Sequence, residues 1–274
     1  MIFIKTAEEI EGMRRACDLV SRTLGEVASW AKPGVTTLKL DTIAREFILD
    51  NGGKPSCLGY HGFPATLCIE VNETVVHGFP SGYVLKEGDI VGTDCVVELN
   101  GFHGDSCYTF PIGEIDEKTM RLLRTTYESL YVGIDAARGG KRVGDISNAV
   151  QTYCERAGYN VVREMCGHGI GRSMHEDPEV PNFGRRGKGA VLKPGMCIAI
   201  EPMINMGSKN VVIESNGWEC RTRDRKPSAH YEHTVVITPE EPEILTTFKY
   251  IEDQIGNIFE TGVKEESKAT TETN

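Results

Sequence analysis

Apolar residues recur at alternating steps of three and four along residues 6–31. These positions are Ile10, Met13, Cys17, Val20, Leu24, Val27 and Ala31. The spacing predicts an amphipathic helix, and Thr6 and Glu9 fit the capping-box pattern at its start. A coiled-coil dimer has a similar spacing, but the stripe covers only three heptads and includes the weak seam residues Cys17 and Ala31. A helix packed on a core is therefore the favoured interpretation.

Further helices and strands alternate in blocks along the chain. Helices are predicted over residues 38–50, 117–138 and 146–157, the last with Asp145 as its N-cap, and strands over 65–110, 159–165, 196–204, 211–220 and 230–238. The clearest strand pair surrounds Asn100-Gly101, because Asn-Gly is the strongest short-range signal for a hairpin. This order of elements predicts an α+β protein.

The block of two helices followed by strands occurs twice. A shift of 106 residues aligns Gly34 with Gly140, and one further residue aligns KEGDIVGTD with KPGMCIAIE, so that Asp94 matches Glu201. The sequence therefore predicts one domain over residues 1–250. Its two similar halves would span about 5–112 and 113–240, with matching acidic strands facing a shared cleft. The remainder, 251–274, is predicted to be a tail that is flexible from about residue 262, as its polar composition indicates.

Net charge, hydropathy and cysteine spacing argue against several classes of protein. The net charge of −10 argues against nucleic acid as the main ligand, because binding to phosphates needs a basic surface. No window approaches the ~20 apolar residues of a membrane span, and the N-terminus lacks the apolar core of a signal peptide, so we expect no membrane partner and a cytoplasmic location. The nine cysteines include no CxxC pair, which predicts reduced, buried thiols rather than disulfides or a zinc finger.

Two aspartates flank the predicted hairpin. If Asn100-Gly101 is a two-residue turn, Asp105 lies opposite Val96, and Asp94, two residues from Val96, points to the same face. Diagonal neighbours of this kind lie about 7–8 Å apart, so both carboxylates can reach one point. A register slip of one residue would place them on opposite faces.

Two further carboxylates, Glu201 and Glu232, lie in the apolar strand sequences CIAIEPMI and HYEHTVVI. His168 lies in GHGIGRSMHE, where three glycines in five positions disfavour a helix. These glycines predict a pliable loop in which the backbone either adopts unusual dihedral angles or lies very close to other atoms. Acidic pairs that simply face solvent are common, but apolar surroundings weaken that interpretation here. Four carboxylates and one imidazole suit two divalent metal ions bridged by shared carboxylates.

These segments resemble the type I methionine aminopeptidases of peptidase family M24. The matching motifs are HGDS at Asp105, GHGIGRSMHE at His168, IEPM at Glu201 and YEHT at Glu232, and the resemblance runs from about residue 5 to 250. It implies the pita-bread fold, a curved antiparallel sheet covered by helices on its outer face, with two pseudo-symmetric halves. The short spacing between Glu201 and Glu232 resembles the minimal bacterial form rather than type II enzymes.

The resemblance also implies a ligand set. Asp94, Asp105, His168, Glu201 and Glu232 would bind two divalent metal ions per chain, with Asp105 and Glu232 bridging them and the histidine-bearing site binding more tightly. Co, Mn, Fe, Zn and Ni are all possible ions.

The implied reaction removes the N-terminal initiator methionine from nascent proteins and peptides whose second residue is small and uncharged. A metal-bound hydroxide would attack the carbonyl after the methionine, with Glu201 as the proton shuttle. His175 would steady the oxyanion, and His77 would contact the scissile amide nitrogen. We expect a monomer that meets its substrates at the ribosome.

A methionine pocket is implied as well, and a thioether suits soft and aromatic walls. Its residues would be Cys57, Tyr60, Phe63, Cys68, Met174 and Trp218. Two of them depart from the family pattern, because Met174 occupies a position that is often aromatic and Phe63 one that is frequently Tyr. Cys57 also fits a purely structural buried thiol.

Two alternatives remain open. A proline-specific peptidase of the same fold uses the same five ligands, although such enzymes usually carry a large additional N-terminal domain. A non-catalytic pita-bread binding protein is less favoured, because such proteins have lost metal ligands.

Overall fold

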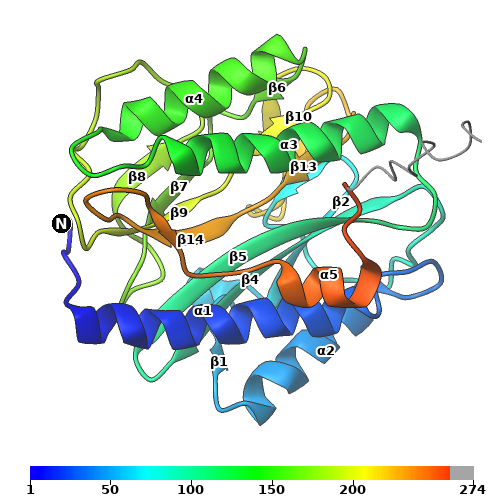
Figure 1. Ribbon diagram of the computed structural model, residues 1–274. Helices are drawn as coiled ribbons and strands as arrows, with labels where there is room; N and C mark the ends of the chain where they lie inside the picture. The colour runs from blue at the N-terminus through cyan, green and yellow to red at the C-terminus, as the bar shows by residue number, and fades with distance from the viewer. Residues whose placement is uncertain (260–274) are drawn as a thin grey trace, which may run out of the picture.

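The computed structural model describes residues 1–259 as helices packed on curved antiparallel sheets (Figure 1). The helices are α1 (Ala7–Ala28), α2 (Thr37–Asp50), α3 (Glu117–Asp135), α4 (Val143–Arg156) and α5 (Lys249–Ile255), with a 3-10 turn η1 (Tyr60–Gly62). The strands are β1 (Lys54–Pro55), β2 (Leu67–Val71), β3 (Thr74–Val76), β4 (Ile90–Leu99), β5 (Phe102–Pro111), β6 (Asn160–Val161), β7 (Cys166–Gly169), β8 (Glu176–Pro181), β9 (Cys197–Ile200), β10 (Met203–Asn205), β11 (Val211–Ile213), β12 (Cys220–Thr222), β13 (Ser228–His230), β14 (His233–Val236) and β15 (Glu243–Ile244). The tail segment expected to be flexible from about residue 262 lies outside the described residues.

Helix α1 begins with the predicted capping box. The Thr6 hydroxyl accepts from the Glu9 N–H at 3.3 Å, and the Glu9 carboxylate accepts from the Thr6 N–H at 3.1 Å. The apolar stripe packs on β4 and β5, where Val20 and Leu24 are fully buried in the main core. That packing uses the surface a coiled-coil dimer would need, so the core-facing interpretation is confirmed.

Helix α4 differs from its prediction at its start. It begins at Val143 with Arg142 as its N-cap, rather than behind Asp145. The Asp145 carboxylate instead accepts from the Arg142 N–H at 2.8 Å, as the third residue of a capping box does. Asp145 thus helps to cap the helix, as expected, but the prediction that it is the N-cap residue is wrong.

The two halves repeat each other in length and in turn geometry. Helices α2 and α4 each contain 14 residues, and the glycines that end the preceding turns, Gly34 and Gly140, have φ angles of 89° and 83°. The glycines that follow the two helices, Gly52 and Gly158, have φ angles of 77° and 91°. All four lie in the left-handed region that favours glycine. In Figure 1, α3 and α4 lie side by side above α1 on the same side of the sheets.

The hairpin of β4 and β5 has the predicted register. Val96 pairs with Asp105, and the turn residues Asn100 and Gly101 have φ angles of 52° and 80°, as a type I′ turn requires. Along β4, Cys95 and Val97 point into the core beneath α1, whereas Asp94 and Val96 point to the opposite face. The helices therefore cover one face of the hairpin and leave the other face for the site.

Two long predicted strands are each interrupted at an acidic residue. The run predicted over 196–204 divides into β9 and β10 around Glu201, and the run over 230–238 divides into β13 and β14 around Glu232. The breaks face each other, because Ile200 pairs with His233 on one side and Met203 with His230 on the other. Glu201 and Glu232 therefore lie between strands, so the direction of each side chain is not set by the alternation of side chains along a strand.

The C-terminal part of the described chain packs on the first helix. Ile251 of α5 is fully buried, and the Tyr250 hydroxyl donates to Asp18 of α1 at 2.9 Å. The domain boundary expected at residue 250 thus falls inside a helix that contacts the core. Among residues 1–259, no helix has the length and apolar character needed to cross a membrane.

Candidate active site

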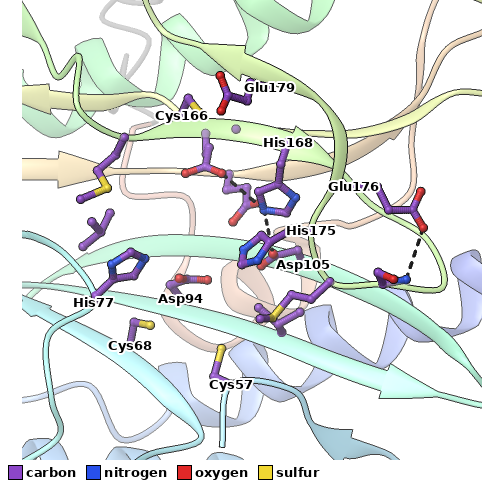
Figure 2. A pocket seen from close by; sticks show the side chains of 18 of the residues that line it. Cys57, Cys68, His77, Asp94, Asp105, Cys166, His168, His175, Glu176 and Glu179 are labelled. Atoms are coloured by element: carbon purple, nitrogen blue, oxygen red, sulfur yellow. Dashed lines mark hydrogen bonds and ion pairs between the residues drawn. The ribbon is translucent and has the colours of Figure 1, made fainter. Parts of the chain in front are cut away.

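A cavity of about 620 Å³ lies on the face of the hairpin away from the helices, and Figure 2 shows it from close by. Twelve of the thirteen side chains expected at the site line this cavity: Cys57, Phe63, Cys68, His77, Asp94, Asp105, His168, Met174, His175, Glu201, Trp218 and Glu232. The exception is Tyr60, whose hydroxyl contacts the ring of His175, a residue that does line the cavity. The structure therefore brings together residues from both halves of the chain.

The closest grouping inside the cavity joins two carboxylates and an imidazole. One ligand atom from each of Asp105, His168 and Glu232 lies within 4.8 Å of the other two. The Nε2 atom of His168 is 3.6 Å from Oδ2 of Asp105 and 3.7 Å from Oε1 of Glu201. Such distances leave room for an ion between the groups.

Burial disfavours the charged form of the carboxylates in this cluster. Burial raises the pKa of Asp105 and of Glu232 well above the usual range, and it raises the pKa of Glu201 to about 8. Within the described residues, Asp94 Oδ1, Asp105 Oδ1 and Glu232 Oε1 are buried without any hydrogen-bond partner. Buried carboxylate oxygens are costly unless paired or bound to a cation, so this set fits divalent metal ions.

His168 lies on strand β7 rather than on the predicted loop. Its Nδ1–H donates to the Gly169 carbonyl at 2.9 Å, which leaves Nε2 free to face the carboxylates. Burial lowers the pKa of His168 to about 4, so the ring is neutral near pH 7, as a metal ligand must be.

The glycines beside His168 serve close packing. A Cβ at Gly167 would lie 2.4 Å from the Ala199 carbonyl oxygen, and one at Gly169 would lie 2.2 Å from that of Asp177. Neither glycine has a positive φ angle. Of the two possibilities raised by the sequence, close backbone approach is therefore the correct one.

Two other histidines border the cluster. The ring of His175 lies 4.4 Å from the ring of His168, and its Nδ1 is 3.0 Å from the Tyr60 hydroxyl. His77 approaches Trp218 edge-on with ring centres 6.0 Å apart, and its φ angle of 60° is an uncommon conformation for a residue other than glycine. Figure 2 shows His77 and His175 on either side of Asp94, so both can reach a substrate above the carboxylates.

An apolar cluster lies beside the carboxylates. It contains five of the residues expected for a methionine pocket, namely Cys57, Phe63, Cys68, Met174 and Trp218. Sequence reasoning missed Ala65, Val96 and Phe79, which belong to the same cluster. Val96 could have been found, because it shares its strand face with Asp94.

A buried pair behind the cluster was also missed. His230, two residues before Glu232, lines the cavity, and its Nδ1 lies 3.2 Å from both carboxylate oxygens of Glu70. The histidine was visible in the motif HYEH, but its partner is 160 positions away in the chain.

Comparisons with known proteins agree with this geometry. Residues 11–239 match the model of metallopeptidase family M24. The methionine aminopeptidase of Clostridium perfringens is 53% identical over 249 residues, which cover 91% of this chain and 100% of that protein. Methionine aminopeptidase 1 of Bacillus subtilis is 47% identical over 246 residues, covering 90% of this chain and 99% of the relative.

Solved structures show the same fold. The crystal structure of methionine aminopeptidase from Rickettsia prowazekii superimposes with a TM-score of 0.89 at 40% identity, covering 90% of this chain and 100% of that one. Prolidase from Pyrococcus furiosus shares the fold at a TM-score of 0.73 and 23% identity, but the match covers only 65% of its length and 89% of ours. The predicted pita-bread fold is confirmed, and the chain belongs to metallopeptidase family M24, within the methionine aminopeptidases.

Proposed function

We propose that this protein is a methionyl aminopeptidase that removes the initiator methionine from nascent proteins and peptides with a small, uncharged second residue. The observation that carries the proposal is the grouping of Asp105, His168 and Glu232 beside an apolar pocket in one cavity. The family relationship supports the same reaction. We further propose that it works as a monomer in the cytoplasm, on chains emerging from the ribosome.

Five residues would hold the metal. We propose that Asp94, Asp105, His168, Glu201 and Glu232 bind two divalent ions, with Asp105 and Glu232 shared between them. One buried oxygen each of Asp94, Asp105 and Glu232 has no hydrogen-bond partner in the described part of the chain, which supports this assignment. When bound, such ions supply a water molecule of lowered pKa and polarise the scissile carbonyl group.

The remaining chemistry belongs to side chains of this protein. Glu201 would accept a proton from the attacking water and deliver it to the departing amine. The Tyr60 hydroxyl lies 3.0 Å from Nδ1 of His175. We propose that this hydroxyl donates to Nδ1, which would place the ring proton on Nε2, where it could stabilise the developing oxyanion. His77 would bond to the scissile amide nitrogen.

The methionine side chain would occupy the apolar cluster. Phe63 lies 5.2 Å from the ring of Trp218, and Cys57, Cys68 and Met174 complete a soft and aromatic surface. Sulfur contacts of this kind favour a thioether. Met174 would thus replace the aromatic side chain frequent in the family without losing affinity for the substrate.

Peptide cleavage tests the proposal against its alternatives. We expect metal-dependent release of methionine from Met-Ala-Ser, at most a small rate on Met-Leu-Ser, and inhibition by EDTA. Preferential cleavage of an X-Pro peptide would instead favour a proline-specific peptidase. Absence of cleavage of any peptide by protein loaded with Co, Mn, Fe, Zn or Ni would favour a binding protein.

A further inference from the structure

Glu70 and His230 form an ion pair inside the sheet. Their side chains are only 2% and 3% exposed, and Nδ1 of His230 lies 3.2 Å from each oxygen of Glu70. Cys107 contributes a weak third contact, since its Sγ donates to Oε2 of Glu70 at 3.8 Å. A buried pair of this kind is costly to desolvate and is weak evidence for stability alone, so another role needs to be considered.

The surrounding strands are shaped to hold this pair. Gly92 of β4 lies opposite Glu70 of β2, and a Cβ on Gly92 would lie 2.3 Å from Oε2 of Glu70. The missing side chain therefore makes the space that the carboxylate occupies. The backbone of His230 is fixed as well, because its N–H donates to the Thr109 hydroxyl at 3.0 Å and its carbonyl accepts from that hydroxyl at 2.7 Å.

The other ring nitrogen of His230 faces the proposed metal centre. Its Nε2 is buried, has no hydrogen-bond partner among residues 1–259, and lies 3.8 Å from Oε2 of Glu201. The second oxygen of Glu201, Oε1, lies on the side of His168 at 3.7 Å from Nε2 of that ring. Glu201 thus lies between two imidazoles, one on each carboxylate oxygen.

We infer that Glu70 and His230 are positioning residues for Glu201. Glu70 fixes the ring of His230 through Nδ1, and His230 directs its Nε2 toward Oε2 of Glu201, which keeps Oε1 toward His168 and the other ligands. A decrease of about 0.5 Å in their 3.8 Å separation would bring Nε2 and Oε2 within hydrogen-bond distance. This inference rests on the proposed participation of Glu201 in the reaction.

The test has two readouts, which are metal affinity by calorimetric titration and kcat and KM on Met-Ala-Ser at saturating metal. His230→Ala should weaken metal binding about 10-fold or more, because Glu201 is a proposed ligand, whereas His233→Gln should leave it unchanged. We expect His230→Ala to lower kcat about 10–100-fold, the usual effect of removing a group that orients a metal ligand, with KM unchanged within about twofold. The double variant Glu70→Gln/His230→Gln keeps an amide donor for Glu201 without the buried charges. It should retain at least about one third of the wild-type kcat, because orientation rather than charge is required.

His233 provides a matched control. It lies three residues from His230 and is equally buried, but its ring bonds to Thr246 at 2.7 Å and stacks on Phe248, away from the cavity. His233→Gln should lower thermal stability and leave kcat of the folded protein unchanged. If His230→Ala does not fold, Gly92→Ala displaces the Glu70 carboxylate instead and should lower kcat at least about fivefold.

Three outcomes would overturn the inference. These are a wild-type kcat in every folded variant that disturbs the pair, an equal loss of kcat in His233→Gln, or a Glu70→Gln/His230→Gln protein as impaired as His230→Ala. Failure of the proposed function itself is distinguishable, because the wild-type protein would then release no methionine under any metal condition.

Discussion

Lys5 and Glu176 form a buried ion pair, with Nζ of Lys5 2.6 Å from Oε2 of Glu176 and both side chains no more than 6% exposed. Gly171 makes room for it, because a Cβ there would lie 2.6 Å from Cε of Lys5. The pair connects the first residues of the chain to the segment that carries His175. It therefore supports one wall of the cavity from a distant part of the sequence.

Removing one partner of this pair should destabilise the protein. We expect Lys5→Met to lower the free energy of unfolding by about 3–5 kcal/mol, because it leaves a buried carboxylate without a counter-charge. The control is Lys54→Met, whose partner Glu98 is 2.7 Å away but whose own side chain is 75% exposed. That change should cost less than about 1 kcal/mol. Urea denaturation measures both, and equal losses would contradict the prediction.

Substitutions of the two histidines in GHGIGRSMHE should have different effects on metal binding and on kcat. We expect His168→Ala to weaken metal binding by an order of magnitude or more, because it removes the imidazole from the ligand cluster. His175→Ala should keep its metal and its KM, but lose kcat about 10²–10³-fold, the usual effect of losing one oxyanion donor. Calorimetric metal titration and steady-state kinetics measure these effects. Equal loss of metal in both variants would refute the assignment.

Replacing either proposed bridging carboxylate should reduce activity and bound metal more than replacing Asp94. Asp105→Asn and Glu232→Gln should each abolish activity and reduce bound metal below about one ion per chain, because both residues belong to the histidine-bearing cluster. Asp94 lies outside that cluster, so Asp94→Asn should retain more metal. Metal analysis of the purified variants measures the difference. Full activity of Asp105→Asn would exclude a two-metal site with this bridge.

The metal-free protein should become less stable as pH rises. The pKa of Glu201 is raised by burial from 4.5 to about 8, so the folded state retains a proton that the unfolded state has released. The window that isolates this effect is pH 6.5 to 8, because histidines of lowered pKa, such as His168, are neutral above pH 6.5 in both states and add no opposing slope there. Stability is therefore greatest at the acidic end of this window and declines toward pH 8. Asp105 and Glu232, with pKa values raised for the same reason, act in the same direction.

Thermal unfolding in EDTA at several pH values tests this dependence. Saturating metal should reverse the trend, because metal binding favours the deprotonated carboxylates. Glu201→Gln should flatten part of the slope in EDTA. A stability profile in EDTA that rises between about pH 6.5 and 8 would contradict the prediction.

Local rules predicted some parts of the site and failed for others. The relation of Asp94 to Asp105 could be predicted, because a two-residue turn fixes the register of both strands. The breaks at Glu201 and Glu232 were missed, although Pro202 cannot donate to a strand ladder and was a visible signal. The pairing of Glu70 with His230 depends on how the two halves meet, which no local pattern encodes. The motifs pointed to the proposed metal ligands, but they gave no sign of the residues that support them.

The division of the cavity between two halves has a consequence for translation. Asp105, Ser106 and Thr109 hydrogen-bond to residues 230–234, which are synthesised more than a hundred positions later. Until residues 230–234 are synthesised, Asp105 therefore lacks the segment that packs against it in the folded protein. A truncated product ending before Glu232 would lack one proposed metal ligand and one wall of the cavity, so we expect incomplete copies of this protein not to hydrolyse peptides.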